Sequence, residues 1–475
     1  MPSRQDQLHS YQYSVQRVVA ALVTHDPDPH RSPLRRAGMT ALIGLVIAAL
    51  AVGAAAIYGL LTGASSTNVR DESAVFLEKG SGARYVYLAS DQKLHPVLNY
   101  SSGLLIANAT EPKLVSTSRK KLATVPLGDP MGIPDAPDSL PGSGKDDLLT
   151  GPWSICTAPP ENTTSGGQPR STLIVGDELT DGTIAAKPGA GQAAQALLVR
   201  DPTDRTFLVY GNRRFLIPPT RYTATLRAFK WGDQQAWPVA AAWINAIPVG
   251  PDIKPPPISG FGDRSGVPQA PEIGQLLTDG NQWAVALADG AAALTEVQAL
   301  LLQTDPQAYT PANVAGQVFN NLTASRTRLS DAGDPDGLPS TVPALAGTPK
   351  RACMTLPVGK NGDGIRIDPT IPAGTAVTAA AAVPGGVQAD LVHVPRGKGA
   401  LVVAAASPTA PATTGTVSIV TDTGRRYPVA TRDVLAKLGY AGVTPKQVPA
   451  QLIALLPQGP SLDVNRARLE ASAGG

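Results

Sequence analysis

Hydrophobic positions near the start of the chain follow a helical pattern. Between residues 3 and 25 apolar side chains recur at alternating spacings of three and four, which predicts one apolar stripe along a helix: Leu8, Tyr11, Val15, Val18 and Leu22. Ser3 can cap this helix with Asp6 three residues on, and Asp26-Pro27-Asp28-Pro29 ends it because proline cannot continue a helix. Such a stripe needs a partner. It either rests on the membrane surface or docks on another protein, and the second is our prediction.

A second pattern follows directly, the unbroken apolar run Met39–Leu61, which has no charged side chain. A helix of this length is roughly 35 Å long and can cross a hydrocarbon core of about 30 Å. Arg31, Arg35 and Arg36 precede the run, and basic residues favour the cytoplasmic side. We therefore predict a cytoplasmic arm over 1–38, a transmembrane helix over 39–61, and an outer part after it.

A cleaved signal peptide is the alternative interpretation of this run. Its apolar core usually spans about 7–15 residues and is followed by a small-residue cleavage site. The run here is longer, and Ala54–Ala56, which could serve as such a site, lies inside it. The pattern favours an uncleaved, single-pass anchor.

After the span, the polarity pattern changes to short alternating segments, which indicate strands. The first group is Arg84–Leu88, a turn at Asp91–Lys93, a second strand at Leu94–Val97 and a helical turn or strand at Ser101–Ala107. The same order of strand, turn, strand and leucine-bearing segment recurs three more times. The later groups have their first strands at Phe207–Tyr210, Trp283–Leu287 and Ser418–Val420, and the last two end in helices at Thr295–Leu302 and Asp433–Leu438.

Two of these groups also match in sequence. Asn212–Phe215 resembles Gly424–Tyr427, and further on Ile247–Pro251 resembles Leu456–Pro460. The uneven spacing of the four groups excludes a solenoid of fixed period. It predicts small modules arranged around a separate central domain.

We accordingly predict an α+β, β-rich outer part with a central domain and four small repeat modules. The central domain is expected in two stretches, 121–200 with Trp153–Cys156 and Thr172–Val175, and 340–408 with Cys353 and the apolar run Gly399–Ala406. The modules are expected at 70–120, 201–255, 270–330 and 412–465. Pro251–Pro257 and Pro335–Pro349 are expected to act as stiff connectors.

The amino-acid composition supports a loop-rich outer part. The 475 residues include 47 Gly and 45 Pro but few aromatics, which favours strands and turns over a large helical core. The net charge of +3 is close to balance, so the chain carries no sign of a nucleic-acid surface.

The only two cysteines, Cys156 and Cys353, both follow the span, on the side where a disulfide can persist. Two unpaired, buried thiols are the alternative. Two cysteines without a nearby histidine cannot build a zinc site.

Catalytic motifs are missing from the sequence. No Gly-Lys pair completes a phosphate-binding loop, since Gly144-Lys145 is followed by Asp146, and the glycine-rich stretch 189–191 does not complete G-x-G-x-x-G. G-x-S-x-G and H-E-x-x-H, the motifs of serine hydrolases and zinc proteases, are absent.

His95 and His393 have apolar and proline neighbours, and His95 is expected to pack under a turn. Residues 334–337 are expected to form a solvated turn, because a proline interrupts them and the terminal Glu of a calcium loop is missing.

The order of motifs along the whole chain resembles a known family. An inner arm with Arg4–Leu8 and one span are followed by Leu94–Asn99, then Met131–Pro137, two distant cysteines and the closing Leu456–Leu462. This combination is similar to EccB, the single-span membrane component of mycobacterial and related actinobacterial type VII (ESX) secretion systems. Leu98, in place of an aromatic residue, and Pro428 are small departures from the family pattern.

The resemblance implies a β-rich central domain with four similar modules in pseudo-two-fold arrangement, and a disulfide between Cys156 and Cys353. It implies assembly with EccC, EccD and EccE in the inner membrane, the MycP protease on the outer side, and contacts between EccB copies. No cofactor or metal is implied, although ATP hydrolysis has been attributed to some members.

Three functions follow as hypotheses. The first is a non-enzymatic scaffold of a secretion complex in the cytoplasmic membrane, with the large C-terminal part in the periplasm. The second is a membrane-anchored module that binds cell-wall polysaccharide, against which the scarce aromatics argue. The third is an ATPase.

Overall fold

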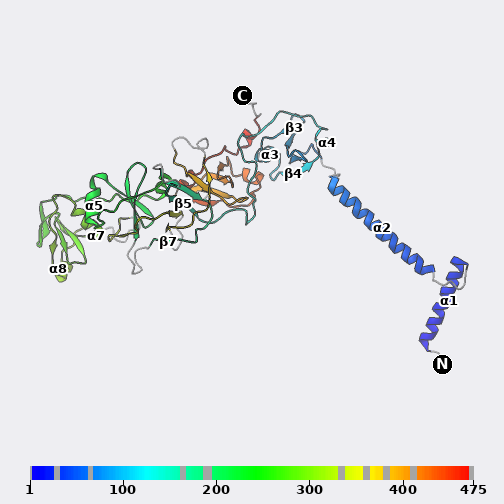
Figure 1. Ribbon diagram of the computed structural model, residues 1–475, viewed down its shortest axis with the longest axis horizontal. Helices are drawn as coiled ribbons and strands as arrows, with labels where there is room; N and C mark the ends of the chain where they lie inside the picture. Colours follow the sequence, from blue (N-terminus) through cyan, green and yellow to red (C-terminus); the bar gives the residue numbers. More distant parts are fainter. Residues whose placement is uncertain are drawn as a thin grey trace.

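A computed structural model describes residues 3–25, 33–62, 68–160, 167–185, 195–329, 337–356, 364–377, 386–406 and 415–469. Two N-terminal helices precede an elongated, β-rich body (Figure 1). The predictions for Asp26–Pro29, for Arg31, for the glycine-rich stretch 189–191 and for 334–336 lie outside the described residues. The α+β class and the single N-terminal apolar helix are confirmed.

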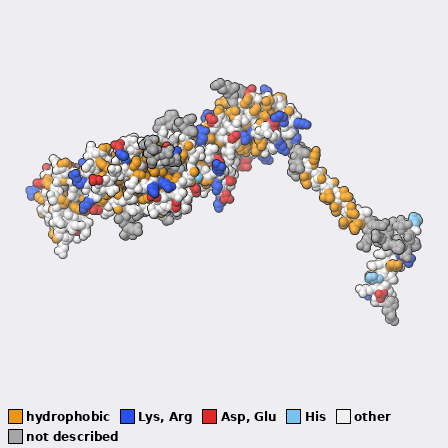
Figure 2. Space-filling model, viewed as in Figure 1, with side chains coloured by type: hydrophobic (Ala, Val, Ile, Leu, Met, Phe, Trp, Pro, Cys, Tyr) orange, Lys and Arg blue, Asp and Glu red, His pale blue; other side chains and the backbone are white. Residues whose placement is uncertain are grey.

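The two helices are those that the hydrophobic pattern predicts. Helix α1 (Arg4–Thr24) begins with the expected capping box: the Ser3 hydroxyl accepts from Asp6 N at 3.3 Å, and the Asp6 carboxylate accepts from Ser3 N at 3.0 Å. Helix α2 (Pro33–Thr62) contains the segment Gly38–Gly59, which is long and apolar enough to span a membrane and is not buried inside the structure. Hydrophobic side chains line it along its length (Figure 2).

Four sheets of the body share one strand order. Three consecutive strands form an antiparallel meander, and a fourth strand pairs parallel with the first. Because a parallel fourth strand needs a crossover connection, each sheet has a helix between its third and fourth strands. We call these sheets, with their helices, the first to fourth sheet units.

The first two sheet units have the following elements. The first comprises β1 (Ala74–Glu78), β2 (Arg84–Leu88), β3 (Lys93–Pro96), α3 (Tyr100–Ile106), β4 (Lys113–Thr117) and α4 (Arg119–Leu122). The second comprises β8 (Gln195–Arg200), β9 (Thr206–Tyr210), β10 (Arg213–Ile217), η2 (Pro219–Arg221), α5 (Tyr222–Ala228), β11 (Trp237–Pro238) and α6 (Ala241–Ala246), and β18 (Ala344–Leu345) also pairs with β8.

The other two repeat this order. The third comprises β14 (Leu276–Thr278), β15 (Trp283–Leu287), β16 (Gly290–Leu294), α7 (Glu296–Leu302), β17 (Ala312–Asn313) and α8 (Gly316–Asn320), preceded by the hairpin β12 (Arg264–Val267) and β13 (Ala270–Glu272). The fourth comprises β23 (Ala400–Ala405), β24 (Val417–Val420), β25 (Arg426–Pro428), α9 (Val434–Lys437), β26 (Lys446–Pro449), α10 (Ala450–Ala454) and α11 (Val464–Ala467).

A seven-stranded central sheet lies between these units. Its order is β21-β22-β6-β5-β19-β20-β7. The strands are β5 (Trp153–Ala158), β6 (Arg170–Ile174), β7 (Thr183–Ile184), β19 (Ala352–Leu356), β20 (Ile365–Ile367), β21 (Thr375–Ala376) and β22 (Leu391–His393). Strands from both predicted central stretches therefore lie in one sheet, where β6 pairs with β22, β5 with β19 and β7 with β20.

Strand pairing differs from the predicted boundaries at three places. Strand β8, expected in the first central stretch, pairs with β9 of the second unit, and β23, which holds the Gly399–Ala406 run, pairs with β24 of the fourth. Met131 bridges to Val97 of the first unit. An apolar run predicts a buried strand but not its partner, which explains the difference. The division into repeat modules and a central domain stays a prediction.

Three apolar clusters join the units in a fixed order. One cluster contains residues of the first and fourth units, a second joins the fourth and second units to the central sheet, and a third joins the second and third units. The body accordingly runs from the first unit beside α2, through the fourth unit, central sheet and second unit, to the third unit at its far end (Figure 1).

Candidate functional site: the inner helix and the interfaces between units

Helix α1 presents the predicted apolar stripe to solvent. The five stripe residues are between 43% and 75% exposed, from Val15 to Leu22. On the other side of the helix Ala20 is buried, and α1 contacts α2. Covering an exposed apolar stripe on a folded helix removes apolar surface from water and is therefore favourable.

The two cysteines form the disulfide that the resemblance implies. Cys156 on β5 and Cys353 on β19 are register partners, are fully buried, and have Cα atoms 3.9 Å apart. The bridge crosses the middle of the central sheet and joins segments 197 residues apart.

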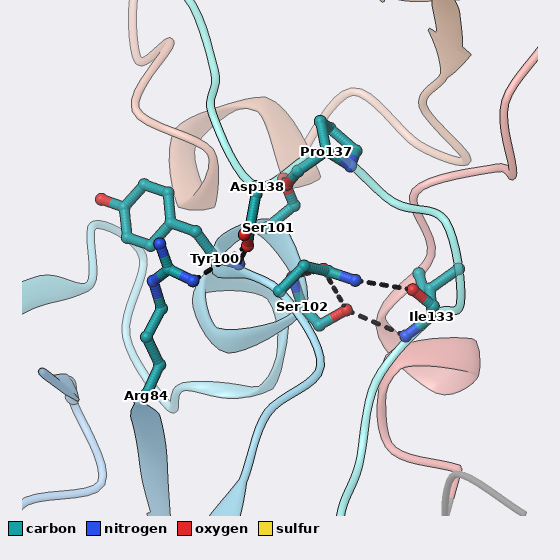
Figure 3. A network of polar contacts seen from close by, with 8 residues as sticks. Arg84, Tyr100, Ser101, Ser102, Ile133, Pro137 and Asp138 are labelled. Carbon is teal, nitrogen blue, oxygen red and sulfur yellow. Dashed lines mark hydrogen bonds and ion pairs between the residues drawn. The ribbon is translucent and has the colours of Figure 1, made fainter. Parts of the chain in front are cut away.

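The structure brings together two motifs on which the resemblance depends (Figure 3). Asn99, at the N-cap of α3, donates from Nδ2 to Ile133 O at 2.8 Å, and its Oδ1 accepts from Ser102 N and Ser102 Oγ. Ser102 Oγ accepts in turn from Ile133 N at 2.9 Å, and Ser101 Oγ donates to Pro137 O at 2.6 Å. These three polar side chains are buried, so every bond replaces one lost to water.

At the edge of this network, Asp138 holds the first turn of α3. Its Oδ1 accepts from Tyr100 N at 3.0 Å and from Arg84 at 2.9 Å, and the Arg84 guanidinium lies over the Tyr100 ring (Figure 3). The Leu94–Asn99 and Met131–Pro137 segments are thus one local structure.

Helix α3 also forms the interface between the first and fourth units, where it packs against α9 and α11. Lys437 Nζ donates to Ala107 O at 2.6 Å and Ala109 O at 2.9 Å, just beyond the C-terminus of α3, and burial lowers the pKa of this lysine. Tyr440 donates to Pro141 O at 2.7 Å, and burial raises its pKa.

The second and third units meet in the corresponding way, through their own crossover helices. Helix α5 packs against α7, and Phe215 and Leu226 share a cluster with Val297 and Leu301. Across the centre, Gln451 of α10 donates to Ala246 O of α6 at 3.0 Å, and these helices hold the same position in their units. The pairing of equivalent elements fits the pseudo-two-fold arrangement that the resemblance implies.

The sequence match between two units corresponds to a shared contact. Gly250 lies against the Phe215 ring and Gly459 against the Tyr427 ring, so closely that a Cβ at either glycine would lie 2.3 or 2.2 Å from a ring carbon. Backbone hydrogen bonds are equivalent too, because Arg214 N donates to Pro248 O and Arg426 N to Pro457 O.

Sequence reasoning missed a third example of this contact. Gly128 lies against the His95 ring, and Leu94 N donates to Pro126 O. The signal was the Val-Pro-Leu-Gly stretch at 125–128, which has the Pro-x-Gly spacing of the other two. His95 is buried, and its ring nitrogens contact Asp91 Oδ2 and Asp129 O, both at 2.9 Å, so it packs under the turn as expected.

One acidic residue of the second unit, Asp201, is only 6% exposed. The Asp201 carboxylate accepts from Thr203 N, Thr203 Oγ1, Arg205 N and Arg205 Nε at 2.8–2.9 Å. Burial alone would raise the pKa of Asp201, but the hydrogen bonds from Arg205 and Thr203 outweigh it and lower the pKa. His393, the other histidine after the span, contacts Ala373 O through Nδ1 at 2.7 Å.

Across the described ranges, no group of three or more His, Cys, Asp and Glu side chains is placed to hold a metal ion. The network around Asn99 connects two segments of the fold, whereas the Asp201 cluster stabilises the single connection between β8 and β9.

In the part of the chain that the structure describes, these features define a single-span membrane protein whose body after the span is a disulfide-tied assembly of small sheets. The family model described as Type VII secretion system ESX-1, transport TM domain B, matches residues 1–473, and the chain belongs to this EccB family.

Relatives cover nearly its whole length. It is 28% identical to the ESX-5 secretion system ATPase EccB5 of Mycobacterium tuberculosis, over 98% of this chain and 93% of the relative. It is 25% identical to the ESX-3 secretion system ATPase EccB3 of Mycolicibacterium smegmatis, with the same coverage.

Solved structures agree with the fold. A chain of the intact ESX-5 inner membrane complex matches with a TM-score of 0.68 and 25% identity, over 100% of this chain and 96% of that one. The EccB3 dimer from the ESX-3 core complex matches in fold, with a TM-score of 0.61 at 22% identity over 83% of this chain and 99% of that one.

Proposed function

We propose that this chain is a structural core component of a type VII secretion inner-membrane complex, in which its outer part oligomerises and scaffolds the periplasmic side. The observation that carries the proposal is the whole-length similarity to a chain of the ESX-5 inner membrane complex. The shared apolar clusters support it, because they couple every unit from the membrane to the far end of the body.

The proposed orientation places the N-terminus in the cytoplasm and the body in the periplasm. The proposed partners are EccC-, EccD- and EccE-type membrane components, a MycP-type protease and further copies of this chain. We also propose that the four sheet units are copies of one module, since they share a strand order and a crossover helix.

Within this assembly, α1 is the proposed docking element for a partner on the inner side. Its exposed stripe is the support, because covering a leucine or valine side chain contributes about 1.5–3 kcal/mol. The test compares the intact chain with a chain lacking Ser3–Thr24, and with a chain in which Leu8 and Val15 are replaced by serine. All are expressed with the other complex components and purified in mild detergent.

Both changes are expected to reduce co-purification of at least one partner while the outer part keeps its thermal unfolding midpoint. The matched control replaces His9 and Gln16, on the opposite face of α1, by serine and should retain all partners. Full retention of partners by the deletion chain would contradict the docking role.

We propose that the chain is not itself an enzyme, although its relatives are named ATPases. The missing phosphate-binding loop in the sequence supports this. The purified chain should hydrolyse ATP no faster than a mock preparation. An ATPase activity that follows the chain through successive columns and is lost on substitution of one acidic residue would favour the ATPase function instead.

A cell-wall-binding role is tested by retention of the purified chain on isolated cell wall.

A further inference from the structure

Basic side chains gather where the chain leaves the membrane span. Helix α4 begins with three of them, Arg119-Lys120-Lys121, and Arg70 and Lys79 lie nearby. We call these five residues the basic collar. In Figure 1, α4 lies beside the end of α2 from which the body extends, and Figure 2 shows blue side chains on that part of the surface.

Packing holds this group beside the exit point. Val69, the first buried residue after the span, and Leu122, the last residue of α4, belong to one apolar cluster. Lys79 N donates to Thr117 O at 2.9 Å, which places Lys79 next to the start of α4. All five residues of the collar are therefore attached to the apolar cluster that contains Val69 and Leu122.

Chain length keeps that core close to the lipid. Helix α2 ends at Thr62, and seven further residues lead to Val69. Even fully extended, seven residues span at most about 25 Å. The start of the outer core, and the basic collar with it, is therefore tethered within about 25 Å of the end of α2.

The basic residues of the collar outnumber the acidic residues nearby, and most of their side chains are exposed. Glu78 is only 5% exposed and accepts from Arg119 Nε at 2.6 Å, whereas the Arg119 side chain is 80% exposed. Asp71 is exposed, and its hydrogen bonds from Ser73 lower its pKa, so it stays negatively charged. With Glu72 and Glu78 it makes three acidic residues against the five basic residues of the collar. Lys79 and Lys120 are both exposed.

We propose that the basic collar docks on anionic phospholipid headgroups of the leaflet that adjoins the outer part. Lipid phosphates attract basic residues next to a membrane span, and arginine and lysine satisfy them with charge-assisted hydrogen bonds. The contact would hold the first sheet unit against the membrane and so set the tilt of the elongated body.

The test uses the full chain in lipid nanodiscs, made either of phosphatidylcholine alone or of phosphatidylcholine with phosphatidylglycerol. Hydrogen–deuterium exchange is followed on peptides that cover 68–80 and 113–125, with peptides of the third unit as an internal reference. The anionic discs should slow exchange of the collar peptides by about fivefold or more, the factor for one basic residue at an anionic surface. High salt should remove the difference.

Lys79→Glu with Lys120→Glu should abolish the lipid dependence. The matched control, Arg264→Glu with Arg328→Glu, alters two exposed basic residues at the far end of the body and should keep it. Equal exchange in both lipids, or persistence of the effect in the collar variant, would overturn the proposal. So would the same slowing by inorganic phosphate in phosphatidylcholine discs, because it would show a free-anion site.

Discussion

Cys156 lies directly opposite Cys353 on neighbouring antiparallel strands, although 197 residues separate them in sequence. The second and third sheet units lie between the two cysteines, so the bridge closes a loop that contains half of the body. The disulfide therefore links the two ends of an insertion and helps to hold the elongated body as one piece.

Removing the bridge should destabilise the outer part without changing its sheet. In the chain-entropy model a loop of this length contributes at most about 5 kcal/mol. Cys156→Ser with Cys353→Ser is expected to lower the thermal unfolding midpoint of the purified chain. Wild-type protein treated with reductant should fall to a similar midpoint, and an unchanged midpoint in both cases would contradict the prediction.

Asn99 should be one of the most sensitive polar positions, because Asn99→Ala removes the N-cap of α3 and leaves the Ser102 amide without its partner. It also removes one of the two hydrogen bonds that Ile133 O accepts, since Ala136 N still donates to this oxygen. The expected loss is about 2–4 kcal/mol of unfolding free energy. Chemical denaturation measures it, and hydrogen exchange should show faster opening of α3. Asn108→Ala, at an exposed asparagine, is the control and should change stability by less than about 0.5 kcal/mol.

Gly250→Ala and Gly459→Ala should both destabilise the chain, because the added methyl group would overlap the Phe215 or Tyr427 ring. Overpacking of this kind costs about 1–3 kcal/mol. Gly316→Ala is the control, since its new Cβ would meet only Asp279 Oδ2 at 3.7 Å. Equal thermal midpoints for all three variants would show that the rings move aside freely.

Asp201 should contribute stability that depends on pH. Its pKa is lower in the folded chain than in the unfolded chain, so the contribution is present above the ordinary carboxyl pKa and is lost as the pH falls through the lowered value. Asp201→Asn should cost about 1.5–3 kcal/mol at neutral pH.

The difference between the Asp201→Asn variant and wild type should narrow in acid, which unfolding midpoints measured across the pH range will show. Asp204→Asn alters a carboxylate that is 82% exposed and should have little effect. If the difference in unfolding midpoint between the Asp201→Asn variant and wild type stayed constant down to the lowest pH measured, the lowered pKa of Asp201 would be contradicted.

Local patterns were enough to predict the elements whose signals are local. The capping box of Ser3 and Asp6, the span, and strands such as β2 and β9 lie where the sequence indicates, because periodicity and capping act over a few residues. Strand β16 was missed, since Gly290–Leu294 is rich in alanine and takes its conformation from pairing with β15.

The stripe on α1 and the position of the two cysteines after the span were determined by the sequence itself, because each depends on residue type and order. Tertiary structure alone decided that β8 and β23 pair within the second and fourth units, that Asn99 binds Ile133, and that α4 packs beside the exit from the span. The physical reason is that an apolar strand or a polar side chain favours burial equally with many partners. Which partner it meets depends on how distant segments pack together.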